Sequence, residues 1–278
     1  MASMPVIVSA TTNHTHTVIF LHGRGDVAEN FVASLRCSKN SRSQSLEEAF
    51  PSFRWVFPKA GVSASFSFGG NKVSQWFDIW DVRDFSEREE VQILGLREST
   101  DMIRKVLNIE AGILGGHWDK IILAGISQGA ATATHALLNL KMPEAADDGT
   151  KLSGGLAAFL GFSCRMPFPG RTLKETRAVL SLKNGPDPED NEVIRKTPVL
   201  LEHCVDDPLV SVENGRVLGD TLRGFGARVH SREYPDGGHW FNSPAGMDDV
   251  VEYLTHVLGL SPSPATGAAA KETEMDLS

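Results

Sequence analysis

Cysteine is scarce in this chain of 278 residues. The three cysteines, Cys37, Cys164 and Cys204, are an odd number at wide spacings, and no CxxC pair occurs. Zinc sites and disulfide frameworks need clustered or paired cysteines, so neither is expected. We interpret the three residues as free thiols of a protein in a reducing compartment.

Positive charge and long apolar segments are also lacking. The 27 basic residues are outnumbered by 35 acidic ones, and no basic run stands out. Nucleic-acid binding needs a concentrated basic surface, so no nucleic-acid partner is expected. The longest apolar-rich stretch, 154–164, is too short to span a bilayer, and the first residues lack the pattern of a signal peptide. A cytoplasmic protein without stable membrane insertion is therefore expected.

Short apolar runs alternate with helical patterns along the chain. Five of the runs are continuous and the sixth alternates, which suits strands buried on both faces of a parallel sheet. The expected strands are 17–21, 54–57, 120–124, 154–160, 198–202 and 227–234. The expected helices are 29–35, 88–109, 127–140, 213–225 and 244–258. This alternation predicts a single α/β domain over 1–260. We also predict an irregular insertion at about 164–196, which could contain a short helix at 172–182. The tail at 261–278 is predicted to be disordered.

The segment Gly125-Ile126-Ser127-Gln128-Gly129 lies where an apolar run meets a helix rich in small residues. A tight turn is one interpretation, and a nucleophilic serine on a strained strand-to-helix elbow is the other. The elbow needs small residues on both sides of the serine, and the helix N-terminus that follows favours an oxyanion. The context favours Ser127 as nucleophile, with the Gln128 backbone N–H, rather than its side chain, stabilising the oxyanion.

A serine nucleophile needs a base and an acid that orients the base. Asp206 and Asp207 follow one expected strand, and His239 follows the next, in the chain order of α/β hydrolases. Taken singly, Asp207 before a proline suits a turn, and His239 in a Gly-Gly loop suits a solvated histidine. Their order along the chain favours Asp207, or Asp206, as the acid and His239 as the base.

Other histidines suit other roles. His203 immediately precedes the acid loop, and we expect it to shape that loop. His14 and His16 form an HxH pair without a further ligand nearby, so we interpret them as solvated and expect no metal site.

A second oxyanion donor is expected from the Gly-rich segment His22-Gly23-Arg24-Gly25-Asp26, through the Arg24 N–H. An ordinary turn is the competing interpretation. The segment does not match a dinucleotide-binding loop, because the third glycine is missing.

An aromatic stretch at 65–81 has two interpretations that the sequence leaves open. Its rings could pack in the core or form the wall of an acyl-binding groove. They belong to Phe66, Phe68, Trp76, Phe77 and Trp80.

The motifs FLHGRGD, QWFDIWD, GISQGA, DDPLVS and PDGGHWF, in this order from about Thr17 to Leu258, resemble the acyl-protein thioesterase, lysophospholipase and small carboxylesterase family of α/β hydrolases. The resemblance implies a mostly parallel central sheet with helices on both faces and no large cap domain. It implies a triad of Ser127, Asp207 and His239, with oxyanion N–H groups from Arg24 and Gln128. It also implies that Trp76, Phe77 and Leu209 contact the substrate.

The sequence departs from the family pattern at several positions: Ile126 for a frequent Phe, Ala130 for a third Gly, Cys204 for a Gly and Ser211 for a Pro. The stretch 164–196 is longer than in compact relatives and is expected to cover part of the site. These departures leave hydrolysis expected and the substrate open.

The resemblance implies a serine hydrolase of acyl thioesters or carboxylic esters, without metal or cofactor. An acyl-protein thioesterase (depalmitoylase) acting on an acylated protein is the first expectation. The alternatives are a short-chain carboxylesterase or lysophospholipase acting on a small acyl ester, and a hydrolase-fold binding protein without turnover.

Overall fold

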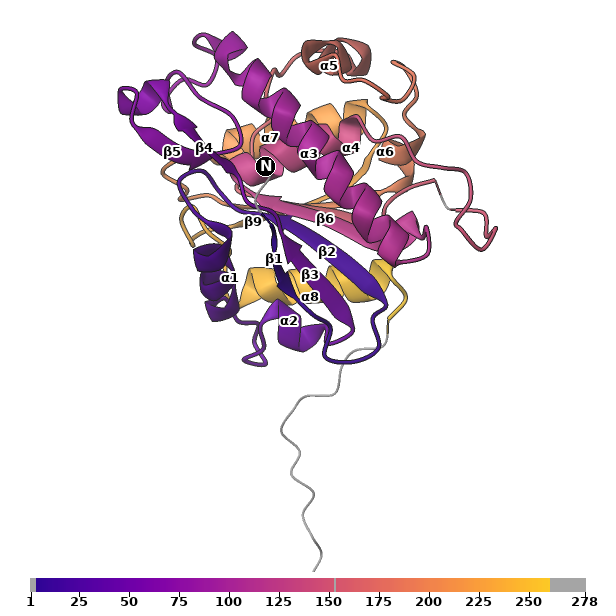
Figure 1. The fold of residues 1–278 in the computed structure, drawn as a ribbon. Helices are drawn as coiled ribbons and strands as arrows, with labels where there is room; N and C mark the ends of the chain where they lie inside the picture. The colour runs from indigo at the N-terminus through magenta and orange to yellow at the C-terminus, as the bar shows by residue number, and fades with distance from the viewer. Residues whose placement is uncertain (1–3, 153, 261–278) are drawn as a thin grey trace, which may run out of the picture.

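The computed structural model describes residues 4–152 and 154–260, which form a layered α/β structure around one large sheet (Figure 1). The sheet has seven strands in the order β1-β3-β2-β6-β7-β8-β9. Only β1 is antiparallel to its neighbour β3, and the other pairs are parallel. The strands are β1 Val6–Val8, β2 His16–Leu21, β3 Phe53–Phe57, β6 Ile121–Ile126, β7 Ala158–Phe162, β8 Pro198–Cys204 and β9 Arg228–Tyr234. The two short strands β4 Gly61–Ala64 and β5 Lys72–Gln75 form a separate antiparallel pair.

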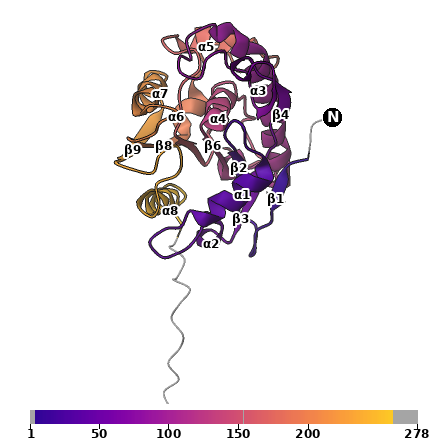
Figure 2. The ribbon, with the colours of Figure 1, turned by 90° about the vertical axis from the view of Figure 1, so that its left-hand side faces the viewer.

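Helices cover both faces of the sheet (Figure 2). One face packs against α3 Gln92–Ile113, α4 Gln128–Leu138, α5 Leu173–Leu180, α6 Glu192–Lys196 and α7 Val212–Gly224. The other packs against α1 Ala28–Cys37, α2 Leu46–Ala49 and α8 Ala245–Val257. Three short 3₁₀ helices lie at Phe66–Phe68, Glu89–Val91 and Trp118–Lys120. The expected mostly parallel sheet with two helical layers is confirmed.

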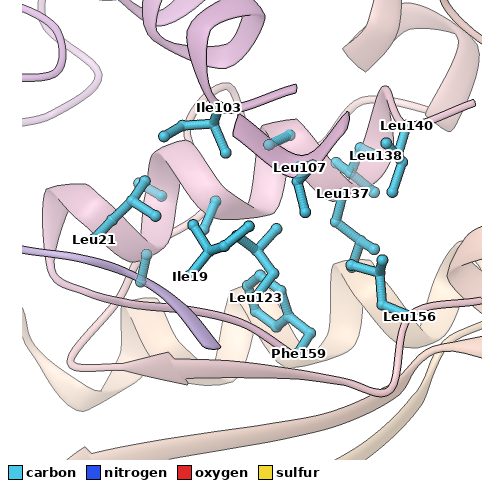
Figure 3. Close-up of a cluster of buried hydrophobic side chains, with 14 of the residues drawn as sticks. Ile19, Leu21, Ile103, Leu107, Leu123, Leu137, Leu138, Leu140, Leu156 and Phe159 are labelled. Carbon is cyan, nitrogen blue, oxygen red and sulfur yellow. The ribbon is translucent and has the colours of Figure 1, made fainter. Parts of the chain in front are cut away.

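The central strands are mostly apolar because their side chains enter two cores in alternation. In β2, Ile19 and Leu21 join the core under α3 and α4, whereas Val18 and Phe20 join the core on the α8 side. All six residues of β6 are buried. Figure 3 shows the first core, where residues of β2, β6 and β7 meet those of α3 and α4. Because these strands are parallel, their carboxyl ends lie together at one edge of the sheet.

Several boundaries differ from those expected. The fourth expected strand, 154–160, is observed as β7 over Ala158–Phe162, because its pairing follows β6 through Gly125 and Ile126. The long helix α3 begins at Gln92 instead of residue 88, since Arg88 has a φ of 45° and cannot continue a helix. The expected helices over 29–35, 213–225 and 244–258 match α1, α7 and α8 within three residues.

The stretch at 164–196 is only partly irregular. It contains α5, which begins with a capping box between Thr172 and Glu175, and α6. Phe168, Leu180 and Ile194 bury their side chains in the core on the α3 side. The tail expected to be disordered, 261–278, lies outside the described residues. In the described part of the chain, every helix is too short or too polar to cross a membrane.

Candidate active site

Ser127 lies at a sharp elbow between β6 and α4. Its backbone φ of 55° and ψ of −125° belong to neither element, and such values in a residue other than glycine indicate strain. Two backbone hydrogen bonds hold the elbow. The Ser127 N–H donates to the Phe162 carbonyl at 2.9 Å, and the Ser127 carbonyl accepts from the Ala131 N–H at 3.0 Å. The neighbouring strand and the first turn of the helix therefore determine where this serine points.

The two glycines of the elbow leave no room for a side chain. A Cβ atom on Gly129 would lie 2.4 Å from the carbonyl oxygen of His22, and one on Gly125 would lie 2.6 Å from the nitrogen of Ala130. Both neighbours are backbone atoms that cannot rotate away. The glycines thus permit α4 to pack close against the ends of β2 and β6.

His239 and Asp207 form a hydrogen-bonded pair. The Nδ1 atom of His239 lies 2.7 Å from Oδ2 of Asp207, whose side chain is fully buried. The other carboxylate oxygen, Oδ1, accepts the backbone N–H groups of Leu209 at 2.8 Å and Val210 at 2.9 Å. An ionised carboxylate only accepts, so the Nδ1 of His239 carries the proton in this bond.

His203 adds a third group to this arrangement. Its Nε2 donates to the Val210 carbonyl at 2.7 Å and lies 3.3 Å from Oδ2 of Asp207. The expectation that His203 shapes the acid loop agrees with these contacts.

The surroundings of Asp207 favour its charged form. Burial by itself would raise the pKa of this carboxyl. The side-chain hydrogen bonds from His203 and His239, together with two backbone N–H groups, outweigh burial and hold the pKa well below its usual range. Asp207 is therefore a carboxylate throughout the neutral and mildly acidic range.

Asp206, the alternative acid, has a different partner. Its exposed carboxylate accepts the backbone N–H of Gly238 at 2.8 Å and so supports the loop that carries His239. Cys204, the departure from the family pattern, packs against the same loop, because a Cβ on Gly237 would lie 2.6 Å from its sulfur. The structure brings Asp207, and not Asp206, to the imidazole.

Ser127, Asp207 and His239 line one cavity of about 950 Å³. Arg24, Gln128 and Leu209 line it too, so six of the eight site residues expected from the sequence meet here. The cavity wall also includes Arg165, Met166 and Pro169 from the stretch 164–196. No motif in the sequence pointed to these three residues.

The segment 22–26 approaches the elbow closely. A Cβ on Gly23 would lie 3.6 Å from the Cβ of Ser127, and Gly25 has a φ of 84°. The Arg24 side chain is fixed by hydrogen bonds to Gln75 at 3.0 Å and Ser67 at 2.7 Å, which belong to the β4–β5 region. Gln128 is the first residue of α4, where backbone N–H groups are unpaired and the helix dipole favours a negative charge.

The Gln128 side chain has a role that the sequence did not suggest. Its Oε1 accepts a hydrogen bond from the backbone N–H of Trp76 at 2.9 Å, and its Nε2 donates to the backbone carbonyl of Phe77 at 2.7 Å. Both bonds are buried. The side chain thereby fastens the aromatic segment to the start of α4.

The aromatic residues divide between the two interpretations left open. Trp76 and Phe77, expected to contact substrate, have 1% and 2% of their surfaces exposed and lie in the core without lining the cavity. The Trp76 indole donates to the His22 carbonyl at 2.8 Å and so fastens the start of the segment 22–26. Phe68 lines the cavity, and Phe66 packs against Trp80 outside it.

The described residues contain no group of three or more His, Cys, Asp or Glu side chains that could hold a metal ion. In the HxH pair, His14 bonds to the Thr17 hydroxyl and His16 to the Thr15 hydroxyl, both at 3.0 Å.

Comparison with known proteins places this arrangement in context. The family described as phospholipase/carboxylesterase matches residues 2–258. An acyl-protein thioesterase 1 of Gibberella zeae is 27% identical, over 90% of this chain and 94% of its own. A rice protein named as a probable inactive carboxylesterase is also 27% identical, over 80% of this chain and 77% of its own.

A solved structure shows the same fold. The crystal structure of Zea mays acyl-protein thioesterase 2 superposes with a TM-score of 0.67 and is 26% identical. The match covers 92% of this chain and 99% of the maize chain. The fold therefore matches over nearly the whole of both chains.

Proposed function

This chain belongs to the phospholipase/carboxylesterase family of α/β hydrolases, and from this premise we propose that it cleaves acyl thioesters with Ser127 as the nucleophile. The observation that carries the proposal is the hydrogen-bonded pair of His239 and Asp207 on the same cavity wall as the strained Ser127 elbow. The family description and the acyl-protein thioesterase relatives support a serine hydrolase of esters or thioesters.

In the proposed mechanism, His239 accepts the Ser127 hydroxyl proton as the oxygen attacks the acyl carbonyl. The Nδ1 of His239 is committed to Asp207, which leaves Nε2 as the accepting nitrogen. The Asp207 carboxylate holds this tautomer and stabilises the imidazolium that forms. Because the hydrogen bonds to Asp207 keep its pKa low, the carboxylate does not take the proton itself.

The negative charge that develops on the carbonyl oxygen is assigned to two backbone N–H groups, those of Arg24 and Gln128. The protonated His239 then delivers its proton to the leaving thiol or alcohol. A water molecule, deprotonated by His239, attacks the acyl-enzyme and releases the carboxylic acid and Ser127.

The acyl-protein thioesterase names of the relatives support an S-acylated protein as the substrate. The cavity volume of about 950 Å³ and its apolar wall residues support the binding of an acyl chain. Phe68, Ile79, Val82, Phe85 and Met166 supply apolar surface to this wall. We also propose a cytoplasmic location, for which the free thiols of Cys37, Cys164 and Cys204 are the support.

A short-chain carboxylesterase or lysophospholipase is the second candidate. One observation favours it, which is the number of charged side chains on the cavity wall: Arg24, Asp26, Arg83, Asp84 and Arg165. Such a mixed lining suits a small or polar ester better than an uninterrupted apolar groove does.

The experiment that tests the function compares thioesters of short and long acyl chains and an S-palmitoylated peptide, each with the unaltered protein and with Ser127→Ala. If the unaltered protein cleaves the S-palmitoylated peptide and Ser127→Ala does not, the result supports a depalmitoylase. Turnover of short esters alone supports the second candidate.

A fluorophosphonate probe addresses the possibility of a binding protein without turnover, which the name of the rice relative raises. Labelling of the unaltered protein and no labelling of Ser127→Ala supports catalysis. If neither protein is labelled and no ester is cleaved, the proposal is wrong.

A further inference from the structure

Arg165 is a buried cation in the wall of the cavity that contains Ser127. It follows β7 by three residues, and β7 pairs with the strand that ends at the elbow. Only 6% of its surface is exposed, and it lines the cavity together with Ser127, Asp207 and His239. A guanidinium so placed has lost most of its water and has the cavity as its remaining open side.

The contacts of Arg165 are electrically neutral. One of its terminal nitrogens donates to Oε1 of Gln92 at 2.7 Å. Gln92 is itself fixed, because its Nε2 donates to the Phe85 carbonyl at 3.0 Å, which turns its oxygen toward the arginine. The guanidinium carbon lies 4.2 Å from the centre of the Phe85 ring and 5.8 Å from that of Phe77. These groups hold the cation in one position without neutralising it.

The acidic groups around the cavity are paired elsewhere, although the charge of Glu89 still acts on Arg165 through space. Glu89 pairs with Arg171 at 2.8 Å, and Asp84 accepts from the Ser86 hydroxyl at 2.6 Å. Asp207 is bonded to its two histidines. Among residues 4–152 and 154–260, no carboxylate oxygen lies within 4.0 Å of the Arg165 guanidinium.

Arg24, a half-buried arginine of the same cavity, differs in this respect. The Ser65 hydroxyl that accepts its hydrogen bond donates in turn to Asp78 at 3.0 Å, which connects the cation to a carboxylate. Arg165 has no such connection in the described part of the chain. Burial lowers the pKa of Arg165 to about 10, so the group remains a cation at neutral pH.

A buried charge without a counterion is unfavourable, and a substrate anion that entered the cavity would compensate it. The planar guanidinium matches a carboxylate in two parallel hydrogen bonds. From this geometry we propose that Arg165 determines specificity by binding a negatively charged carboxylate-type group on the substrate. This inference rests on the proposed hydrolase function and specifies its substrate class.

The anion could belong to the acyl group or to the leaving group, and two pairs of esters separate these sources. In the acyl pair, 4-nitrophenyl hexanoate is compared with the mono-4-nitrophenyl ester of adipic acid, which ends in a carboxylate. In the leaving-group pair, 4-carbamoylphenyl hexanoate is compared with 4-carboxyphenyl hexanoate. The two esters of each pair have similar sizes and differ by one charge. The Ser127→Ala variant gives the background rate of hydrolysis.

Arg165→Met removes the charge and keeps much of the apolar side chain, and Arg165→Lys keeps the charge without the planar fork. Arg171→Met is the matched control, because Arg171 lies on the same segment beside an aromatic ring but is exposed, paired with Glu89 and outside the cavity.

In one of the two pairs, Arg165→Met should lower kcat/KM for the charged ester by roughly 10- to 100-fold and change the neutral ester by less than about threefold. Arg165→Lys should lie between Arg165→Met and the unaltered protein, and Arg171→Met should match the unaltered protein. An equal loss on charged and neutral esters in both pairs overturns the inference, because it indicates a structural role only.

The unaltered protein supplies a second test that does not depend on how the variants fold. It should prefer the charged member of one pair by roughly tenfold or more in kcat/KM. Preference for the neutral member in both pairs overturns the inference and leaves the hydrolase function intact. If none of the four esters is cleaved and the fluorophosphonate probe does not label the protein, both the proposed function and the inference are overturned.

Discussion

The Oδ2 atom of Asp207 lies 2.7 Å from Nδ1 of His239, although 32 residues separate them along the chain. The same carboxylate binds the N–H groups of its own loop through Oδ1. One buried charge therefore fixes both the shape of the acid loop and the orientation of the imidazole. Two predictions concern this relationship directly, and the others concern the elbow and the sheet.

Replacement of Ser127 by alanine should abolish turnover, because the attacking oxygen is removed. We expect kcat to fall by at least about 10³-fold for an activated ester, with little change in thermal stability. Ser163→Ala is the matched control, since Ser163 also has a positive φ at the end of the neighbouring strand but is buried outside the cavity. Comparable loss in both variants, measured as initial rates, would count against Ser127 as nucleophile.

Asp207→Asn should lower kcat by on the order of 10³- to 10⁴-fold, because the amide no longer holds the imidazole tautomer. The matched variant is Asp206→Asn, whose amide oxygen can still accept the Gly238 N–H. It should retain activity within about threefold. If Asp206→Asn is the more damaging of the two, the assignment of the acid is wrong.

Asp207 should also contribute to stability in a pH-dependent way. Its folded pKa lies below the ordinary value of 3.8, so its stabilising contribution is complete above that value. It is lost as pH falls from there through the folded pKa. Chemical denaturation of the unaltered protein and Asp207→Asn should show a difference in unfolding free energy that shrinks below about pH 4. A difference that stays constant into strong acid contradicts the prediction.

Gly129→Ala should destabilise the protein and impair catalysis. The added methyl group would lie 2.4 Å from the His22 carbonyl oxygen, so either α4 or the segment 22–26 must move. We expect a loss of about 1–3 kcal/mol in unfolding free energy. Gly112→Ala, in the α3 helix, brings the added methyl within 4 Å of no atom beyond its chain neighbours and the backbone of its own helix, and should instead stabilise by about 0.5–1 kcal/mol. Equal effects of the two substitutions would show that the elbow tolerates a side chain.

Glu202→Gln should stabilise the protein at neutral and alkaline pH. Burial, together with the nearby carboxylate of Asp249, raises the pKa of Glu202 well above 4.5. A raised folded pKa means that stability is complete below the unfolded value and is lost as pH rises through the folded one. Melting temperatures across a pH series should show the variant gaining on the unaltered protein with rising pH. Glu252→Gln, at an exposed position on α8, is the control and should show no such trend.

The sequence was sufficient for features that depend on neighbours along the chain. The glycines around Ser127, the apolar run before it and the small residues after it predicted the elbow that the structure contains. The order of the apolar runs and helical patterns predicted the sheet, because strands buried on both faces must be apolar throughout. The expected site also converged, with Ser127, Asp207 and His239 on one cavity wall.

Other features depend on residues that meet only in the folded chain. The sequence favoured Asp207 as the acid and left Asp206 as an alternative, and the direction of each side chain decided between them. Trp76 and Phe77 could have lined the cavity, but the Gln128 side chain holds their backbone against α4, and both rings pack in the core.

The sequence by itself thus determined the order of the strands, the elbow and the polar loops along the chain, because local geometry and burial specify these features. The tertiary structure alone decided the charge of the cavity wall. Arg165 meets Gln92 across 73 residues of chain, and its isolation from carboxylates depends on where every neighbouring acid points. Such an arrangement leaves no local pattern, because the energy of a buried charge is set by everything that surrounds it in space.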